Sequence, residues 1–281
     1  MINSWLFWAL GAAVLWGAGA IFSKKALATF TPLVYNLVNI PLDVFLLLPF
    51  AFYFGFNLAH FTINDFLLLS FIVSSYTLYY YVISLNKLAL SGTVLSTYPL
   101  ITMLLAVLFL GEKLTGAQLI WILILMTGVV LIGLPSRLEN VRLEGWFLAA
   151  LGMAIFSGLA DFLAKDLITR VGVGNYFLFI GLAYIPPNLL CFVLDKKGRV
   201  WPKIKLSRWP FLLTGAALLV LGSGFFFTAL SLGPASVVAP VSSLYAVITV
   251  ILSFIFLKER LTKVQALGVA LAVLGVVFIS V

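Results

Sequence analysis

The feature that most constrains this chain is a series of apolar runs, each close to 20 residues long, separated by short stretches that carry charge, proline, glycine or asparagine. A helix needs about 20 mostly apolar residues to cross a bilayer. The runs are too long for barrel strands and lack their alternation, so we expect helices, which satisfy their backbone polar groups internally. The sequence predicts an all-α integral membrane protein with ten transmembrane helices at residues 4–23, 33–54, 65–85, 91–110, 116–134, 145–164, 175–194, 209–230, 235–257 and 263–280.

Composition excludes several other classes of protein. The chain is 63% hydrophobic and 9% charged with a mean hydropathy of +1.19, whereas soluble chains are about 45–50% apolar and about 25% charged. The single cysteine, Cys191, provides neither a disulfide framework nor a cysteine-built metal site. The net charge of +8 fits basic residues gathered on one membrane face better than nucleic-acid binding. We expect no cofactor and no bound metal.

The second half of the chain repeats the first. Residues 109–120 read FLGEKLTGAQLI and residues 256–267 read FLKERLTKVQAL, an offset of 147 residues. The same offset aligns further identical residues, among them Ser96 with Ser243, Tyr98 with Tyr245, Thr102 with Thr249 and Gly128 with Gly275. This pattern indicates an internal duplication.

Each repeat holds five predicted helices, in residues 1–137 and 138–281. Because five is odd, the second repeat enters the membrane from the opposite side, and a pseudo-twofold axis in the membrane plane relates the two. Many secondary transporters are built from inverted repeats of this kind around a site near the bilayer midplane.

The duplicated phrase predicts a helix connection on each face. Thr115 with Gln118, and Thr262 with Gln265, have the spacing of a capping box at the start of a helix. Two glutamates precede these boxes at equivalent positions. They could accept hydrogen bonds from neighbouring helix starts or pair with the adjacent basic residues, Glu112 with Lys113 and Glu259 with Arg260.

These features resemble the drug/metabolite transporter superfamily, in its ten-helix branch with two EamA domains. The resemblance rests on residues 110–115 (LGEKLT), residues 257–262 (LKERLT), Trp16-Gly17 and Lys25, and it covers the whole chain. It implies a carrier, since members move amino acids, nucleotide precursors, choline-like cations, sugar phosphates and toxic organic compounds, mostly by proton coupling or exchange.

The basic residues predict an orientation. Fourteen of the 17 Lys and Arg lie on one side of the predicted helices and three, Lys113, Lys165 and Arg170, on the other. Because Lys and Arg favour the cytoplasm, both termini are expected outside and the 195–208 loop inside. Members of this family are often expected to have cytoplasmic termini, so the charge distribution departs from the family pattern.

Two acidic residues lie deep in predicted helices, where ionisable groups are costly and usually face a cavity. Asp43 shares a helix face with Asn36 and Asn39, and this polar stripe should point into the bundle. Asp161 has two interpretations: it forms a pair with Lys165 one turn later, or it contacts substrate or a coupling proton. We therefore treat both acids as candidate coupling and substrate-binding residues.

Aromatic residues with a polar end complete the candidate site. A buried tyrosine hydroxyl needs a partner, and aromatic rings can bind organic cations or stack on aromatic solutes. The candidates are Trp16, Tyr76, Tyr79, Tyr80, Tyr98 and Tyr245, and ordinary packing is the alternative for each of them. Pro41, Pro99, Pro186, Pro187 and Pro240 are expected to interrupt helices along the path.

The sequence thus predicts a secondary transporter of a small organic metabolite, such as an amino acid, an amine or a drug-like compound, that works by alternating access in the inner (cytoplasmic) membrane. Export is the favoured direction, protons are the expected coupling ion, and the protein is a monomer or a homodimer. The alternative is an exchanger or channel-like permease for a phosphorylated or nucleotide-type metabolite. A membrane enzyme is disfavoured because the only histidine, His60, lies in a loop and Cys191 is solitary.

Overall fold

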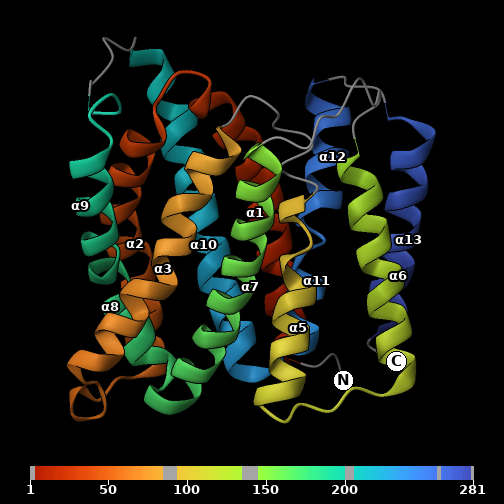
Figure 1. Ribbon diagram of the computed structural model, residues 1–281, viewed down its shortest axis with the longest axis horizontal. Helices are drawn as coiled ribbons and strands as arrows, with labels where there is room; N and C mark the ends of the chain where they lie inside the picture. Colours follow the sequence, from red (N-terminus) through yellow and green to blue (C-terminus); the bar gives the residue numbers. More distant parts are fainter. Residues whose placement is uncertain (1–3, 85–93, 135–144, 200–205, 258–260, 280–281) are drawn as a thin grey trace.

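The computed structural model describes residues 4–84, 94–134, 145–199, 206–257 and 261–279, and the regular structure in these ranges is helical (Figure 1). The α-helices are α1 Ser4–Leu27, α2 Pro32–Phe54, α3 Ile63–Ile83, α5 Tyr98–Phe109, α6 Gly116–Gly133, α7 Gly145–Val171, α8 Val173–Ala183, α9 Ile185–Leu194, α10 Trp209–Leu232, α11 Ala235–Ser242, α12 Tyr245–Leu257 and α13 Lys263–Ile279. Two 3-10 turns, η1 Leu58–His60 and η2 Leu206–Arg208, lie in connections. The predicted all-helical membrane fold is confirmed.

Eight helical segments of the described chain are long and apolar enough to cross a membrane, with α8 and α9 together as one segment and α11 and α12 as another. Two further apolar helices, α5 and α13, are shorter, with 12 and 17 residues. The predicted helix 91–110 contains α5, but residues 91–93 lie outside the described ranges. The number of ten crossings therefore stays a prediction.

Two of the predicted spans are each divided into two helices beside prolines. The break between α8 and α9 falls at Tyr184, next to Pro186 and Pro187. The break between α11 and α12 falls at residues 243–244, shortly after Pro240. Proline lacks the amide hydrogen of the helix ladder and crowds the preceding turn, so the break before Pro186 and Pro187 follows from the sequence. Pro240 lies inside α11, and the break comes after it.

The prediction that Pro41 interrupts a helix is wrong. α2 continues without a break from Pro32 to Phe54, with both Pro41 and Pro49 inside it. A membrane helix tolerates an internal proline where neighbouring groups satisfy the freed backbone carbonyl, so a proline alone does not end it.

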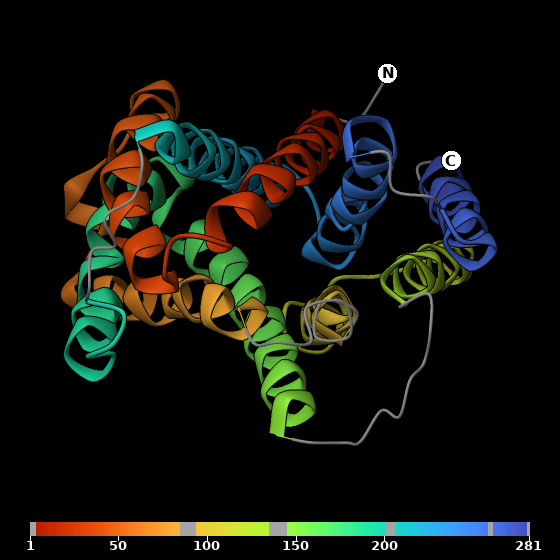
Figure 2. The ribbon, with the colours of Figure 1, turned by 90° about the horizontal axis from the view of Figure 1, so that it is seen from above.

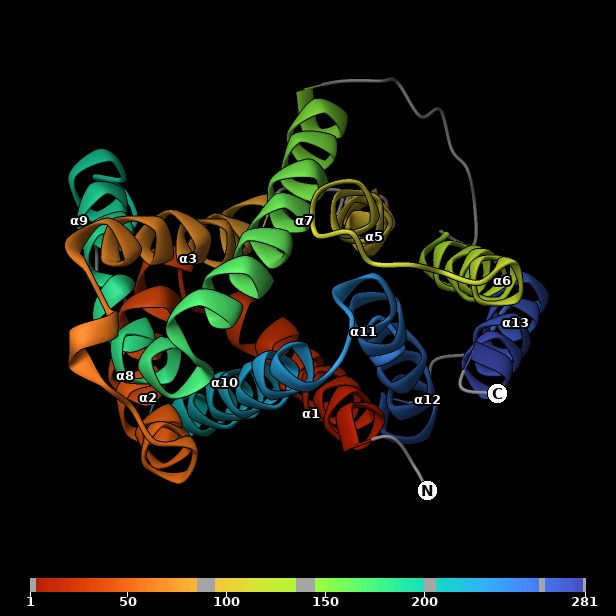
Figure 3. The ribbon, with the colours of Figure 1, turned by 90° about the horizontal axis from the view of Figure 1, so that it is seen from below.

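The helices pack in pairs that bring the two halves of the sequence together. α1 lies along α10, α2 packs against α8, and α3 and α5 both contact α7. α6 and α13 pack against each other at one edge of the molecule, far from α8 and α9, as the two views along the helices show (Figures 2 and 3). α1 also crosses α12, and this arrangement sets residues from distant parts of the chain around a common interior.

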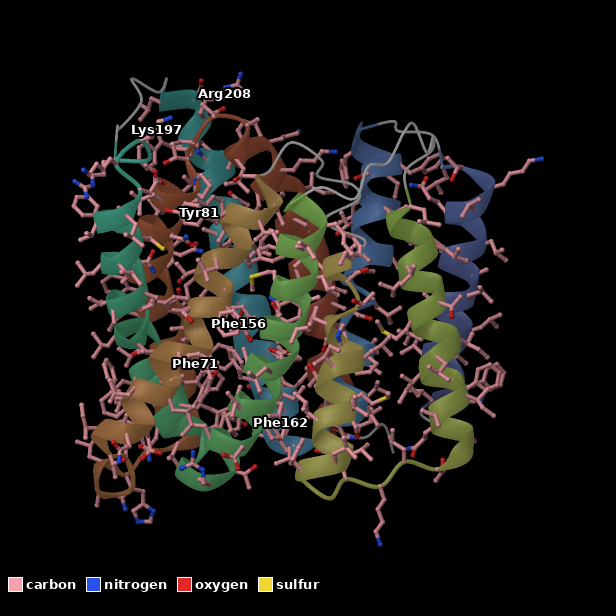
Figure 4. The ribbon with its side chains drawn as sticks, viewed as in Figure 1. Phe71, Tyr81, Phe156, Phe162, Lys197 and Arg208 are labelled. Carbon is pink, nitrogen blue, oxygen red and sulfur yellow. The ribbon has the colours of Figure 1, made fainter. Side chains whose placement is uncertain are left out.

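The two ends of the bundle differ in charge. Both termini and the connection between α5 and α6 lie at one end, at the bottom of Figure 1, while α9 ends and α10 begins at the other. Lys197 and Arg208 lie at this second end (Figure 4). α1 also ends there, since the Lys25 ammonium lies 5.4 Å from the ring centroid of Phe211 in the first turn of α10. The described chain thus carries the charge asymmetry on which the predicted orientation rests.

The outer surface is apolar, whereas several polar residues are inside. Large side chains such as Phe45, Tyr53 and Phe109 are exposed on the perimeter. The buried polar residues include Asn36, Asn39, Asp43, Thr102, Asp161 and Asn188. This arrangement suits a protein surrounded by lipid tails, where a polar group is stable only if it faces other protein groups or a cavity.

Candidate functional site

A cavity of about 890 Å³ lies between the helices. Nine of the ten residues predicted to contact substrate line it: Trp16, Asn39, Asp43, Tyr76, Tyr79, Tyr80, Tyr98, Asp161 and Tyr245. They come from α1, α2, α3, α5, α7 and α12, so helix packing brings both halves of the sequence to one site. The volume is within the range of about 300–1,000 Å³ that is usual for small-molecule sites.

Asp161 on α7 is joined to Tyr76 on α3. The Tyr76 hydroxyl donates a hydrogen bond of 2.7 Å to Oδ1 of Asp161, which is 2% exposed. The second carboxylate oxygen, Oδ2, is buried and has no hydrogen-bond partner among the described residues. The carboxylate is thus held in one orientation with one acceptor unused.

Asp43 on α2 is the second buried acid of the cavity. It is 3% exposed, and none of the described residues forms a hydrogen bond or an ion pair with it. Tyr184, at the end of α8, and Tyr80 on α3 line the same cavity. A buried carboxylate without a partner is costly, so this site is suited to a ligand or a proton.

Asn39 lies one turn before Asp43 and connects α2 to the tyrosines of α3. Its amide nitrogen donates to the Tyr80 hydroxyl at 3.3 Å, and its Oδ1 is buried without a partner among the described residues. The Tyr80 ring packs on that of Tyr35, with centroids 4.5 Å apart, and the Tyr35 hydroxyl lies 2.6 Å from Ser23 Oγ on α1. This network links the first three helices.

Asn36, the tenth predicted residue, does not line the cavity. Its amide donates a hydrogen bond of 3.0 Å to the backbone carbonyl of Thr77 on α3, and the Thr77 hydroxyl is in turn within 3.4 Å of the Asn188 amide on α9. Asn36 therefore holds α2 against α3 behind the cavity wall.

Trp16 on α1 forms part of the cavity wall. Its indole nitrogen donates to the Leu219 carbonyl at 3.1 Å, and its ring lies 5.1 Å from Phe226 and 6.1 Å from Tyr245, measured between centroids. The hydrogen bond and the ring contacts fix the indole, so it offers a rigid aromatic surface to the cavity.

Tyr98 and Tyr245, which the repeat aligns, have equivalent places in the structure. Tyr98 is the first residue of α5 and Tyr245 the first residue of α12. Each follows a two-residue turn that interrupts the helix, at 96–97 and 243–244. Both line the cavity. The two halves thus contribute the same residue at corresponding positions.

The helix crossings next to these tyrosines are also equivalent. The Thr249 hydroxyl lies 3.3 Å from the Gly17 carbonyl oxygen and the Thr102 hydroxyl 3.2 Å from the Gly158 carbonyl oxygen, and each is also shared with the carbonyl one turn earlier in its own helix. A Cβ at Gly17 would lie 2.9 Å from the Tyr245 carbonyl oxygen, and one at Gly158 would lie 2.7 Å from that of Tyr98. α1 thus crosses α12 as closely as α7 crosses α5.

The cavity reaches the surface at the basic end of the bundle. There it is lined by the ends of α1, α3 and α6 and by the start of α13, including Lys24, Ala28, Ser84, Leu134 and Thr262. Of these, Lys24, Ala28 and Ser84 are exposed. None of the described lining residues comes from the connection between α5 and α6 or from α11. The cavity is therefore open at one end of the molecule.

Glu112 helps to close the opposite end. Its two carboxylate oxygens accept hydrogen bonds of 2.8 Å from the backbone amides of Ala235 and Ser236, the first two residues of α11. The free amides and the dipole of a helix start stabilise a carboxylate placed there. Of the two roles open to Glu112, capping a neighbouring helix is the one observed, while Glu259 lies outside the described residues.

Lys165 does not pair with Asp161, the partner that one interpretation of the sequence gave it. Its ammonium donates to the carbonyls of Leu230 at 2.6 Å and Gly233 at 3.0 Å, at the end of α10. The proposed pair with Asp161 is therefore wrong. The end of α10 offers unpaired carbonyls, whereas Asp161 is bonded to Tyr76. Together, Lys165 and Glu112 fix the short segment between α10 and α11.

Two chemically distinctive residues of the cavity were not among those predicted from the sequence. Tyr184 lines it at the break between α8 and α9, and Lys24 lines it near the surface. Tyr184 carries the signal used for the other tyrosines, a polar aromatic residue inside an apolar run, and it directly precedes Ile185 and two prolines. Lys24 is one of the fourteen basic residues on the predicted cytoplasmic side, and a charge at the end of a membrane helix is common enough not to indicate a site.

The capping boxes that predicted two helix starts are confirmed. The Thr115 hydroxyl accepts a hydrogen bond of 3.2 Å from the backbone amide of Gln118. In return, Oε1 of Gln118 accepts one of 3.0 Å from the backbone amide of Thr115. Thr262 and Gln265 form the same pair of bonds, at 3.2 and 3.1 Å. Both helices of the α6–α13 pair therefore start where the duplicated phrase predicts.

A multi-pass helical protein with a polar cavity among its membrane helices has the architecture of a membrane transporter. A model of the EamA-like transporter family matches residues 3–134 and residues 144–281. The chain belongs to this family, and the predicted membership of the drug/metabolite transporter superfamily, with two EamA domains, is confirmed.

The chain is also similar to individual proteins. An uncharacterized protein of Methanocaldococcus jannaschii is 30% identical over 131 residues, which span 46% of this chain and 91% of that protein. A crystal structure of another protein matches with a TM-score of 0.79 at 18% identity, over 98% of this chain and 96% of that one. At this identity the second likeness shows a shared fold alone.

Proposed function

We propose that this protein is a secondary transporter that carries a small organic molecule across the membrane by alternating access. The observation that carries the proposal is the cavity itself. It is lined by two buried acids and a set of aromatic side chains, opens at the basic end of the bundle and is closed at the other. A channel would need a continuous path and a selectivity filter, whereas a carrier exposes its site to one side at a time.

The alternating mechanism rests on two inverted five-helix repeats, residues 1–137 and 138–281, with ten crossings in all. The matched crossings at Gly17 and Gly158 support this arrangement, because each repeat's first helix packs against the fourth of the other. The relative from Methanocaldococcus jannaschii, nearly all of which matches 131 residues of this chain, is consistent with a unit of this size.

In this proposal the ends of the bundle are opened and closed in turn. In the conformation described, Glu112 and Lys165 tie the segment between α10 and α11 at the end that holds the termini. Release of these contacts, with closure of the basic end, would expose the same acids and aromatics to the other side. If the charge asymmetry sets the orientation, the described conformation faces the cytoplasm.

Asp43 and Asp161 are the proposed coupling residues. Both are buried in the cavity, and neither forms an ion pair with a described residue, so each can exchange a proton or a cationic group with the cavity. The proposed substrate-binding residues are the nine that line the cavity, while Asn36 has a supporting role through Thr77. An inner-membrane location and export remain part of the proposal.

A permease for phosphorylated or nucleotide-type metabolites is the second candidate, and the cavity favours it less. A phosphate carries about two negative charges at pH 7 and binds best to arginine or lysine. Among the described residues that line the cavity, Lys24 is the only basic one, and it lies at the open end. The deep part of the cavity instead contains two acids.

The test is counterflow in proteoliposomes that contain the purified protein. Vesicles preloaded with one candidate solute should accumulate trace labelled solute transiently and saturably, and an imposed pH gradient should change the rate. Asp43→Asn and Asp161→Asn should abolish the response to the gradient. Asp166→Asn is the matched control, because Asp166 is also on α7 but pairs with Arg170 at the surface. Counterflow that ignores the gradient and survives both cavity substitutions would contradict coupling through these residues.

A further inference from the structure

Deep in the cavity, the buried polar atoms that have no hydrogen-bond partner among the described residues are acceptors. Oδ2 of Asp161 and Oδ1 of Asn39 are both buried and without a partner among the described residues. The carboxylate of Asp43 adds further acceptor oxygens with no hydrogen bond from a described residue. A buried polar group without a partner costs free energy, so a ligand that fits this cavity must bring hydrogen-bond donors.

The deep part of the cavity contains two acids, and the one basic residue among its described lining residues, Lys24, lies at the open end. Asp43 and Asp161 are 3% and 2% exposed. The two basic residues of α7 have other partners. Lys165 binds carbonyls at the end of α10, and Arg170 pairs with Asp65 and Asp166. A charge inside a membrane protein is stable when an opposite charge accompanies it, so the ligand that satisfies this site is a cation.

Aromatic rings line the same cavity as the acids. Trp16, Tyr76, Tyr98 and Tyr245 line the cavity from four different helices, and Tyr79 adds a fifth ring. A ring face attracts a cation, and it also packs against an apolar or aromatic body. The cavity therefore suits a molecule with a positively charged head and a ring or hydrocarbon body.

We infer that the transported substrates are protonated organic amines, with the ammonium group bound at Oδ2 of Asp161 and the body against the aromatic wall. This inference deepens the proposed transporter function and rests on it. An ammonium brings three N–H donors and no acceptor, which matches the unused acceptors of Asp161 and Asn39. Tyr76 acts as a positioning residue, because its hydroxyl binds Oδ1 and leaves Oδ2 without a partner among the described residues.

The same chemistry argues against ligands whose binding depends on a negative group. A carboxylate or phosphate deep in the cavity would lie with two acids and without a basic partner among the described residues there. A neutral alcohol could donate one hydrogen bond but would leave the negative charge unbalanced. We therefore expect an amine to bind more tightly than its alcohol or acid analogue of the same size.

The test uses 2-phenylethylamine and two matched analogues, 2-phenylethanol and 3-phenylpropionate, with calorimetry on the full-length protein in detergent. The amine should bind saturably and at least tenfold more tightly than either analogue. Phenylalanine, which adds a carboxylate to the amine, should bind no more tightly than 2-phenylethylamine. Equal binding of the alcohol or the acid would overturn the inference, as would the absence of amine binding at millimolar concentrations.

Variants assign the binding to the proposed atoms. Asp161→Asn should weaken amine binding at least tenfold and leave the weak binding of 2-phenylethanol unchanged, because only the amine uses the charge. Tyr76→Phe should weaken amine binding by a smaller factor, since the carboxylate remains. Asp166→Asn, on the same helix but at the surface, should leave amine affinity unchanged. If Asp161→Asn binds the amine like the unmodified protein, the assignment is wrong.

Binding and counterflow measurements together distinguish an error in the substrate class from an error in the carrier function. Saturable counterflow of a different solute, without amine binding, would leave the carrier function in place and reject amines as its substrates. Failure of every solute in counterflow, with amine binding at Asp161 intact, would instead reject the carrier function and leave the binding site.

Discussion

The hydroxyl of Tyr76 lies 2.7 Å from Oδ1 of Asp161, and this hydrogen bond joins α3 of the first repeat to α7 of the second. The two residues are 85 positions apart in the chain and both line the cavity. Because the bond fixes the carboxylate at the boundary between the repeats, the geometry of the site depends on how the two halves pack.

Tyr76→Phe should lower both stability and substrate affinity. The substitution removes the only hydrogen-bond donor that Asp161 has among the described residues, and a bond to a charged group contributes about 1.5–3 kcal/mol. The melting temperature in detergent should fall, and the KM of transport should rise more than kcat falls. Tyr81→Phe is the matched control on α3, since the Tyr81 hydroxyl bonds to Asp195 near the basic end. Equal effects of the two substitutions on KM would contradict a role for Tyr76 in the cavity.

Glu112→Ala should loosen the closed end of the bundle. The change removes both acceptors of the first α11 amides, and loss of a helix cap costs about 0.5–2 kcal/mol. Hydrogen–deuterium exchange should therefore accelerate in residues 233–240. The exposed neighbour Lys113, changed to Ala, should leave exchange in this segment unaltered. Unchanged exchange in Glu112→Ala would show that the cap contributes little to the closure.

Gly158→Ala should destabilise the crossing of α5 and α7. The added Cβ would lie 2.5 Å from Cβ of Ile101 and 2.7 Å from the Tyr98 carbonyl oxygen, so one helix must move. Overpacking of this kind costs about 1–3 kcal/mol and should also reduce transport, because Tyr98 lines the cavity. Gly152→Ala on the same helix meets no atom within 4 Å and should keep or slightly raise the melting temperature, since alanine favours helix.

Cysteine labelling in a Cys191→Ser background should place the two ends of the bundle on opposite sides of the membrane. Lys113→Cys, in the α5–α6 connection, is expected to react with an impermeant maleimide in intact cells. Lys197→Cys, at the basic end, should react only after permeabilisation, because basic segments favour the cytoplasm (Figure 4). Reaction of both cysteines from the same side would reject the inverted arrangement, and exchanged sides would reverse the orientation.

The sequence by itself determined the features that depend on nearby residues. Apolar runs of spanning length specify membrane helices, because an unpaired backbone group is costly in lipid. The capping boxes at Thr115 and Thr262 formed as predicted, since each bond spans only three residues. The positions of Asp43 and Asp161 deep in helices marked them as cavity residues for the same local reason: the sequence shows how far each lies from a helix end.

Only the tertiary structure decided which partner each polar group has. Lys165 is one turn from Asp161, yet it binds carbonyls at the end of α10, while Asp161 is bonded to Tyr76 85 residues away. Asn36 and Asn39 share a helix face, but only Asn39 lines the cavity. Helical periodicity gives the direction of a side chain and not the helix it meets. That choice depends on the packing of the whole bundle, in which each buried polar group must find a partner or face the cavity.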